Sequence, residues 1–140
     1  MNVYLESSAA LRDLLDGADA SEVRSLVAEA AVVATSRLTL AEVARVLVRL
    51  RVVEPTIAAA VAAREAQLQA ESELWAILPV DEEIWARCAR PFPVEPIRLL
   101  DAVHLASIEK LSAALPALTV ISMDDRVRRN AAALGFAVRP

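Results

Sequence analysis

The chain has 140 residues, of which 56% are hydrophobic and only 4% aromatic, and it carries a formal net charge of -4 at pH 7. This length is enough to bury a core without disulfides, so we expect a single domain over residues 1–140. The acidic balance excludes a surface that attracts nucleic acid by overall charge. The single cysteine, Cys88, excludes an internal disulfide or a cysteine-rich metal site.

Arginine supplies nearly all of the positive charge, since Lys110 is the only lysine. Arginine binds phosphate through a fixed fork of donors, but its abundance also follows from genomic base composition, and both explanations remain open. The mean hydropathy is +0.42, yet no apolar run reaches the roughly 18 residues of a membrane span, and no signal-peptide pattern is present. We therefore expect a cytoplasmic protein without a membrane segment.

The first predicted unit is a strand followed closely by a helix. Residues 2–5 are β-prone, Ser7 and Ser8 offer N-cap hydroxyls, and residues 9–15 follow a helical pattern. Glu6 therefore lies at the carboxyl end of the strand. It is either a functional acid or a carboxylate that favours the positive end of the helix dipole.

The next unit has the same order. A second helix is predicted over 21–29, and a second strand, apolar on both faces, over 31–35. The following helix, over 36–47, has Thr39 as its expected N-cap. Glu42 stands three residues after Thr39 and completes a capping box, which gives Glu42 a purely structural interpretation.

One face of this helix carries charge. Glu42, Arg45 and Arg49 follow one another at helical spacing, opposite a stripe of apolar residues. The charged face is either a solvated surface or the lip of an anion-binding site.

The middle of the chain contains predicted helices and a strand but no candidate site residue. We expect an alanine-rich helix over 56–71, a strand over 74–78, a short helix ending at residue 89 and a proline-rich loop over 91–96.

A helix that begins near Leu99 places a carboxylate among apolar residues. Its apolar positions are Leu99, Ala102, Val103, Leu105 and Ala106. An ionised Asp101 among them costs several kcal/mol, roughly, unless a cation or several donors contact it. Either His104, one turn away on the same face, or a group from another segment must compensate Asp101.

The end of the chain predicts a last strand–helix–strand unit. Strands are expected over 118–121 and 136–138, separated by a helix over 126–134 that Gly135 closes as its C-cap.

Asp124 follows its strand much as Glu6 follows the first one. A structural interpretation is again available, in which Ser122 caps the helix, Asp125 completes a capping box and Asp124 is an acid of the turn.

Alternating strands and helices with short connections predict a three-layer α/β/α domain around a mainly parallel sheet of four to five strands. In such sheets ligands bind beyond the carboxyl ends of the strands. Acids gathered there would repel one another and raise one another's pKa, and a hard divalent cation relieves this conflict. Oxygen ligands without clustered His or Cys suit Mg²⁺ or Mn²⁺, which can hold a phosphodiester and activate a water.

Five segments carry a resemblance to a known family. They are YLESSA at 4–9, LTLAEV at 38–43, LLDAVHLA at 99–106, ISMDDR at 121–126 and AAALG at 131–135. Their order resembles PIN-domain ribonucleases, most closely the VapC toxins of bacterial toxin–antitoxin modules, over nearly the whole chain. The segment around Asp101 is the most specific of the five.

The resemblance implies a function and assigns residues to it. An acidic quartet would bind Mg²⁺ or Mn²⁺ and hydrolyse RNA with a metal-activated water: Glu6, Glu42, Asp101 and Asp124, with Glu6 and Asp101 as direct ligands. The residues expected to support these acids are Ser8, Ser122, Asp125 and His104. The residues expected to face RNA are Arg37, Arg45 and Arg49. The resemblance also implies an RNA substrate such as transfer RNA, a homodimer, and a cognate VapB-like antitoxin that inserts a helix and a basic side chain into the acidic pocket.

One departure from the family pattern leaves an alternative open. The family usually has aspartate where this chain has Glu6, and the added methylene moves the carboxylate by roughly 1 to 1.5 Å. Because Mg²⁺ requires near-ideal octahedral geometry, this shift could weaken the metal site. The alternative function is an inactive PIN-like module that binds protein or RNA. A nuclease acting on DNA flaps also uses clustered acids, but it needs additional elements that this chain is too short to supply.

Overall fold

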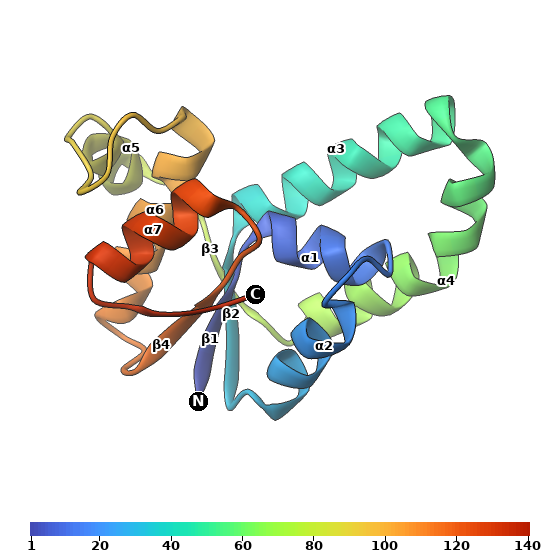
Figure 1. Cartoon of the computed structure of the whole chain (residues 1–140), viewed down its shortest axis with the longest axis horizontal. Coiled ribbons are helices and arrows are strands. Elements are labelled where there is room, and N and C mark those ends of the chain that lie inside the picture. The colour runs from blue at the N-terminus through green and yellow to red at the C-terminus, as the bar shows by residue number, and fades with distance from the viewer.

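The computed structural model describes all residues, 1–140, and contains one five-stranded sheet (Figure 1). The strands are β1 (Asn2–Leu5), β2 (Val32–Ser36), β3 (Ala76–Leu78), β4 (Leu118–Ile121) and β5 (Ala137–Arg139). Their order is β3-β2-β1-β4-β5 and every neighbouring pair is parallel. The predicted mainly parallel sheet is confirmed, with β1 at its centre.

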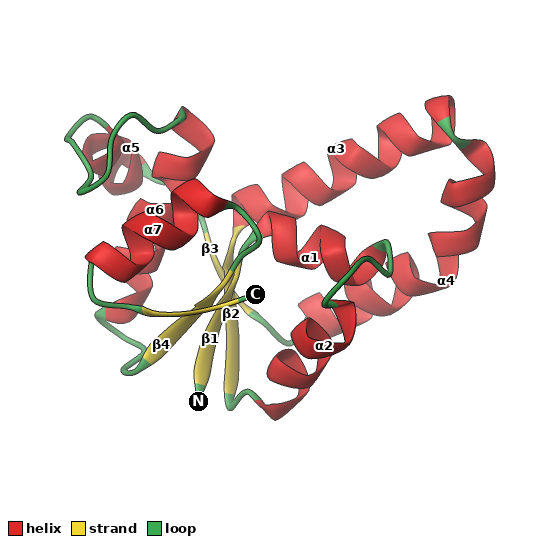
Figure 2. Cartoon of the chain, viewed as in Figure 1, coloured by secondary structure: helices red, strands yellow, loops and turns green.

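Helices cover both faces of this sheet (Figure 2). The helices are α1 (Ser7–Leu14), α2 (Ala20–Glu29), α3 (Arg37–Val53), α4 (Pro55–Ser72), α5 (Glu82–Cys88), α6 (Leu99–Ser112) and α7 (Asp125–Ala133). Helices α1 to α4 lie on one side and α5 to α7 on the other, which confirms the three-layer α/β/α prediction. None of the helices combines the length and the apolar character that crossing a membrane requires.

The central strand divides its side chains between two cores. Val3 and Leu5 pack into the core beneath α1 to α4, whereas Tyr4 packs into the core beneath α6 and α7. This follows from the pleat of a strand, in which successive side chains point to opposite faces. All three side chains are buried. Strand β1 is therefore held rigidly from both sides, directly before Glu6.

Helix α3 begins at Arg37, one residue after its predicted start, but the predicted N-cap at Thr39 and its capping box are wrong. The N-cap is Ser36, whose Oγ accepts a hydrogen bond from Leu38 N at 3.2 Å. The strand β2 ends at Ser36 without an intervening loop, so the helix is already formed at Thr39. The Thr39 hydroxyl instead donates to the carbonyl of Leu5 at 3.4 Å. The structural interpretation of Glu42 as a capping residue is thereby removed.

Helix α7 also differs from its predicted start. Its N-cap is Asp124 rather than Ser122, and Asp124 Oδ1 accepts from Arg126 N at 2.7 Å and from Val127 N at 3.3 Å. The helix ends at Ala133 with Leu134 as its C-cap, one residue before the prediction, and Gly135 follows with a φ of 92°, in the left-handed region that glycine adopts without strain.

Helix α6 buries four of its five predicted apolar positions, and the exception is Leu99. The residues from Ala102 to Ile108 are all buried, but Leu99 is 60% exposed. The first turn of α6 lies at the surface, so Leu99 does not belong to the apolar face. Asp101 is only half-buried and is less costly to ionise than predicted.

Candidate functional site

Glu6 occupies the junction between β1 and α1. Its backbone is extended, with φ -84° and ψ 158°, and it is the N-cap of α1. Because it continues the alternation of β1, its side chain lies on the same side of the sheet as that of Tyr4. Glu6 is 3% exposed, so its carboxylate needs partners within the protein.

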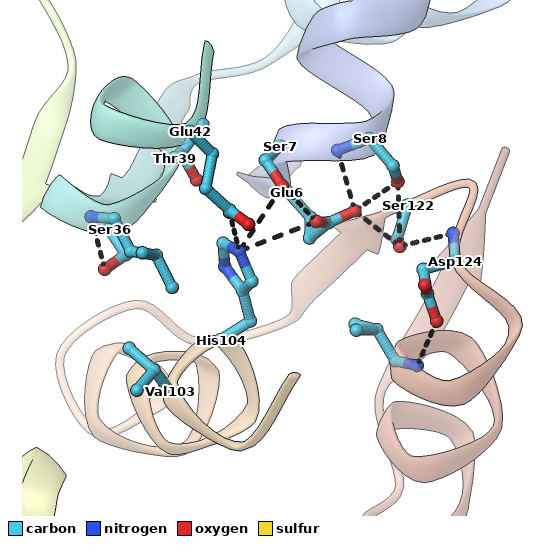
Figure 3. Close-up of polar contacts among 12 residues, drawn as sticks. Glu6, Ser7, Ser8, Ser36, Thr39, Glu42, Val103, His104, Ser122 and Asp124 are labelled. Carbon is cyan, nitrogen blue, oxygen red and sulfur yellow. Dashed lines mark hydrogen bonds and ion pairs between the residues drawn. The ribbon is translucent and has the colours of Figure 1, made fainter. Parts of the chain in front are cut away.

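Hydroxyl and amide donors surround the Glu6 carboxylate (Figure 3). Its Oε1 accepts a hydrogen bond from Ser7 Oγ at 2.6 Å. Its Oε2 accepts from Ser8 N at 3.0 Å, from Ser122 Oγ at 2.8 Å and from the Ser8 hydroxyl. These donors satisfy the buried acid and fix the direction in which it points. Ser8 and Ser122, two of the predicted supporting residues, both contact the Glu6 carboxylate.

Glu42 and His104 complete the cluster. His104 Nε2 lies 2.8 Å from Glu42 Oε2 and 3.5 Å from Glu6 Oε1. Glu42 comes from α3 and His104 from α6, so the two helices bring these side chains together above the end of β1. The alternative in which His104 compensates Asp101 is not what the structure shows, because no hydrogen bond joins the two side chains.

The pKa of Glu42 lies below its ordinary value of 4.5. Burial of the carboxylate acts to raise this pKa, but hydrogen bonding, first of all to His104, outweighs the effect of burial. The side chain of Glu42 is 24% exposed, whereas that of His104 is 2% exposed. Glu42 therefore forms the solvent-facing side of the cluster.

His104 also has a partner below it. The hydroxyl of Tyr4 lies 2.8 Å from His104 Nδ1, and the two rings meet edge to face with 6.1 Å between their centroids. Both residues are buried. A chain of contacts therefore runs from the central strand through α6 to α3.

The cluster has the chemistry of a cation site. One ligand atom each from Glu6, Glu42 and His104 lie within 4.8 Å of one another. Two carboxylates that face each other at this separation repel one another unless a donor or a cation lies between them. Carboxylate oxygens suit Mg²⁺ or Mn²⁺, so the residues present fit such an ion.

Asp101 and Asp124 lie outside this group of three. Asp101 Oδ2 accepts from Arg98 N at 3.0 Å at the start of α6. Asp124 caps α7, and its backbone N–H donates to Ser122 Oγ at 3.1 Å, which in turn contacts Glu6. Each of the two aspartates keeps one carboxylate oxygen without a hydrogen bond. Asp125 is exposed in the first turn of α7.

The three arginines proposed from the sequence are all exposed on α3: Arg37, Arg45 and Arg49. None of them forms an ion pair with Glu42 or Glu54, whose side chains are therefore not what holds these arginines in place.

Sequence reasoning missed three contributors to the site. Ser7 follows Glu6 directly, and Tyr4 precedes it at the spacing that shares a strand face, so both could have been found from local position. Arg128, whose Nη1 donates to the carbonyl of Ser122 at 3.2 Å, gave no such signal.

The chain matches one family model and several solved structures. The model of the PIN domain family matches residues 3–133. No curated protein sequence matches the chain. A chain of the FitAcB structure from Neisseria gonorrhoeae is 20% identical with a TM-score of 0.68, covering 99% of this chain and 96% of that one.

Two further structures have similar scores. VapC20 from Mycobacterium tuberculosis, described as a toxin that cleaves the sarcin–ricin loop, is 22% identical with a TM-score of 0.63, covering 99% of each chain. A chain of VapBC2 from Rickettsia felis, bound to a DNA fragment from its promoter, is 11% identical with a TM-score of 0.64, covering 99% of this chain and 98% of that one. At these identities the similarity establishes the fold. Because the family model covers almost all of the residues and the fold agrees along the whole length, the chain belongs to the PIN domain family.

Proposed function

We propose that this protein is a Mg²⁺- or Mn²⁺-dependent endoribonuclease and the toxin of a VapBC-type toxin–antitoxin pair. The observation that carries the proposal is the pairing of Glu6 and Glu42, two carboxylates from separate segments that face each other at the end of the central strand. Membership of a nuclease family and similarity in fold to a toxin that cleaves the sarcin–ricin loop support it.

Glu6 and Glu42 would hold the metal ion from the interior of the site, and Asp101 and Asp124 would complete the acidic quartet with their free oxygens. When bound, the ion supplies the activation of a water and the neutralisation of the phosphate that the water attacks. Ser7, Ser8 and Ser122 keep the Glu6 carboxylate in one orientation by hydrogen bonding, and Asp125 flanks the site at the start of α7.

The partners are proposed on the same basis. Several similar structures are complexes, as VapBC and FitAB are, which supports a cognate antitoxin bound to this chain. Structured RNA, such as transfer RNA, is the substrate class, and Arg37, Arg45 and Arg49 would face its backbone. A homodimer in the cytoplasm is the form in which we expect the protein to act.

A second candidate function rests on Glu6 itself. Its Oε2 already accepts hydrogen bonds from two hydroxyls and one backbone N–H, so the longer side chain folds back onto α1 and has less capacity left for a metal. On this basis the chain could be a PIN-like module that binds RNA or a partner without cleaving.

An RNA-cleavage assay that starts from metal-depleted protein and adds back one metal at a time separates the two functions. Transfer RNA and an RNA containing the sarcin–ricin loop are incubated with wild type in EDTA, Mg²⁺ or Mn²⁺, and with the variants Glu42→Gln and Asp101→Asn. We expect cleavage only with metal and a loss of about 100-fold or more in both variants, since even residues behind a metal ligand change activity by 10- to 100-fold.

Glu22→Gln is the matched control. Glu22 is exposed on α2, and its replacement removes the same negative charge. This variant should cleave as wild type does. Cleavage that is equal in all proteins would indicate a contaminating nuclease, and its absence with both metals would favour the binding module. Either result contradicts the proposed function.

A further inference from the structure

His104 is the only histidine of the chain, and its ring lies between a tyrosine and two glutamates. A histidine beside two carboxylates is a common metal-binding set, so the group of Glu6, Glu42 and His104 suggests that the imidazole is a ligand. The hydrogen bonds around the ring point to a different role.

The Tyr4 hydroxyl decides which nitrogen of the ring carries the hydrogen. Tyr4 is completely buried, and its hydroxyl lies 2.8 Å from His104 Nδ1. A tyrosine hydroxyl keeps its hydrogen at neutral pH. Ser107 and Thr39 also lie near this hydroxyl, but their own hydroxyls donate to the carbonyls of Val103 and Leu5. A buried hydroxyl needs an acceptor, and Nδ1 is an acceptor only when it carries no hydrogen.

The other side of the ring leads to the same assignment. Nε2 lies 2.8 Å from Glu42 Oε2 and 3.5 Å from Glu6 Oε1. Ionised carboxylates only accept hydrogen bonds, so a lone pair on Nε2 would face a negative oxygen and be repelled. A hydrogen on Nε2 turns both contacts into attraction. Only one neutral tautomer therefore satisfies Tyr4, Glu42 and Glu6 together.

We propose that His104 is a positioning residue and not a metal ligand: its Nε2–H donates to Glu42, with Glu6 beside it, and holds the two carboxylates together, while Tyr4 fixes the tautomer from below. The part of this proposal that concerns the metal rests on the proposed function. A lone pair on Nε2 would be needed for ligation, and the contacts of the ring in this fold leave none.

The tautomer can be read directly by NMR of ¹⁵N-labelled protein, because a single histidine gives one pair of ring-nitrogen signals. The spectrum is recorded at about pH 8, first without metal and then with Mg²⁺. We expect a hydrogen on Nε2 and none on Nδ1 in both spectra. A hydrogen on Nδ1, or loss of the Nε2 hydrogen on addition of Mg²⁺, would overturn the proposal.

Tyr4→Phe tests how the tautomer is fixed. This variant removes only the hydroxyl, so the ¹⁵N signal of Nδ1 should shift as its lone pair loses the donor, while Nε2 keeps its hydrogen because Glu42 and Glu6 still face it. The fold is followed by circular dichroism. An Nδ1 signal that does not move would show that the Tyr4 hydroxyl does not donate to Nδ1.

Two variants of His104 test the positioning role through Mg²⁺ affinity, measured by calorimetry. His104→Gln keeps an N–H donor near the place of Nε2, whereas His104→Leu has none. We expect His104→Leu to bind Mg²⁺ about 10-fold or more weakly, and His104→Gln to recover most of that loss. Equal weakening in both variants would contradict the role of the donor. If His104→Leu does not fold, the two spectra of wild type still decide the question, because a ligand must lose the Nε2 hydrogen on addition of Mg²⁺ and a positioning donor keeps it.

The outcome for His104 is separate from that for the nuclease. The spectrum without metal requires neither RNA cleavage nor Mg²⁺ binding. If Mg²⁺ neither binds nor supports cleavage while Nε2 keeps its hydrogen, the proposed function fails and the assignment of the tautomer stands.

Discussion

The Glu42 carboxylate is exposed to two opposing effects. Burial favours its neutral form, whereas the hydrogen bond from His104 favours the ionised form and prevails, so the pKa of Glu42 is lowered. A group whose pKa is lower in the folded chain than in the unfolded chain stabilises the fold when it is ionised. That stabilisation is complete above the unfolded value of 4.5 and is lost as the pH falls through the folded value.

The pH dependence of unfolding tests this balance. The free energy of unfolding by urea is compared for wild type and Glu42→Gln, in EDTA, between about pH 5 and pH 3.5, where imidazole is already protonated in the unfolded chain. The advantage of wild type should shrink steadily towards the acid end. Glu22→Gln, which removes an exposed charge, should give a nearly constant difference. An advantage of wild type that grows on acidification would mean that the pKa of Glu42 is raised.

Single residues of the site could be predicted as far as their position along the chain decides their place. Glu6 is found because it directly follows a strand, and Glu42 because it lies near the start of a helix that follows a strand. The partner of His104 could not be found in this way, since Glu42 is 62 residues away and only the packing of α6 against α3 brings them together. Helical spacing suggested Asp101 instead, which is a neighbour of His104 in sequence and not its partner.

At the scale of elements, one buried carboxylate ties three helices together through two arginines. The side chain of Asp13 in α1 is 6% exposed and contacts Arg24 of α2 at 2.6 Å. It also contacts Arg64 of α4, whose Nε has no hydrogen-bond partner. Helix α3 runs outward from the sheet, and α4 runs back towards the body of the protein (Figure 1). Arg64 belongs to this returning helix.

Removing the carboxylate of Asp13 should therefore loosen α4. We expect Asp13→Asn to lower the free energy of unfolding by about 3 kcal/mol, because two arginines then lose their shared partner in a mostly buried place. Asp16→Asn is the matched control, since Asp16 contacts Arg24 at 2.7 Å but its side chain is 78% exposed. Its effect should stay below about 1 kcal/mol. Urea unfolding measures both, and equal effects of the two variants would contradict the structural role of Asp13.

The order and type of the elements could be predicted because apolar periodicity and turn residues alternate clearly along the chain. The boundaries of the elements were harder to predict from the sequence. The helix predicted over 36–47 continues to Val53, where Pro55 begins the next helix. Its N-cap was misplaced because β2 and α3 adjoin directly, and the sequence does not show that the loop between them is missing. Local capping patterns compete with each other, and tertiary packing decides between Ser36 and Thr39.

For the whole molecule, the net charge of -4 means that RNA must be attracted by a local basic surface. Three arginines on α3 are exposed and free of ion pairs, so they can provide it: Arg37, Arg45 and Arg49. A contact between an arginine and a phosphate releases counterions, which makes the affinity depend on salt. RNA binding by this surface should therefore weaken steeply as salt is added.

The double variant Arg45→Gln with Arg49→Gln should bind transfer RNA more weakly in EDTA, where no cleavage takes place. The slope of log affinity against log salt should also fall by about 2, one for each lost phosphate contact. Arg51→Gln is the control on the same helix, because Arg51 is already paired with Glu65 at 2.7 Å. Its slope should match that of wild type, since a paired arginine releases few counterions. If the double variant keeps both the affinity and the slope of wild type, the RNA does not lie along α3, and the basic surface must be sought on another face of the molecule.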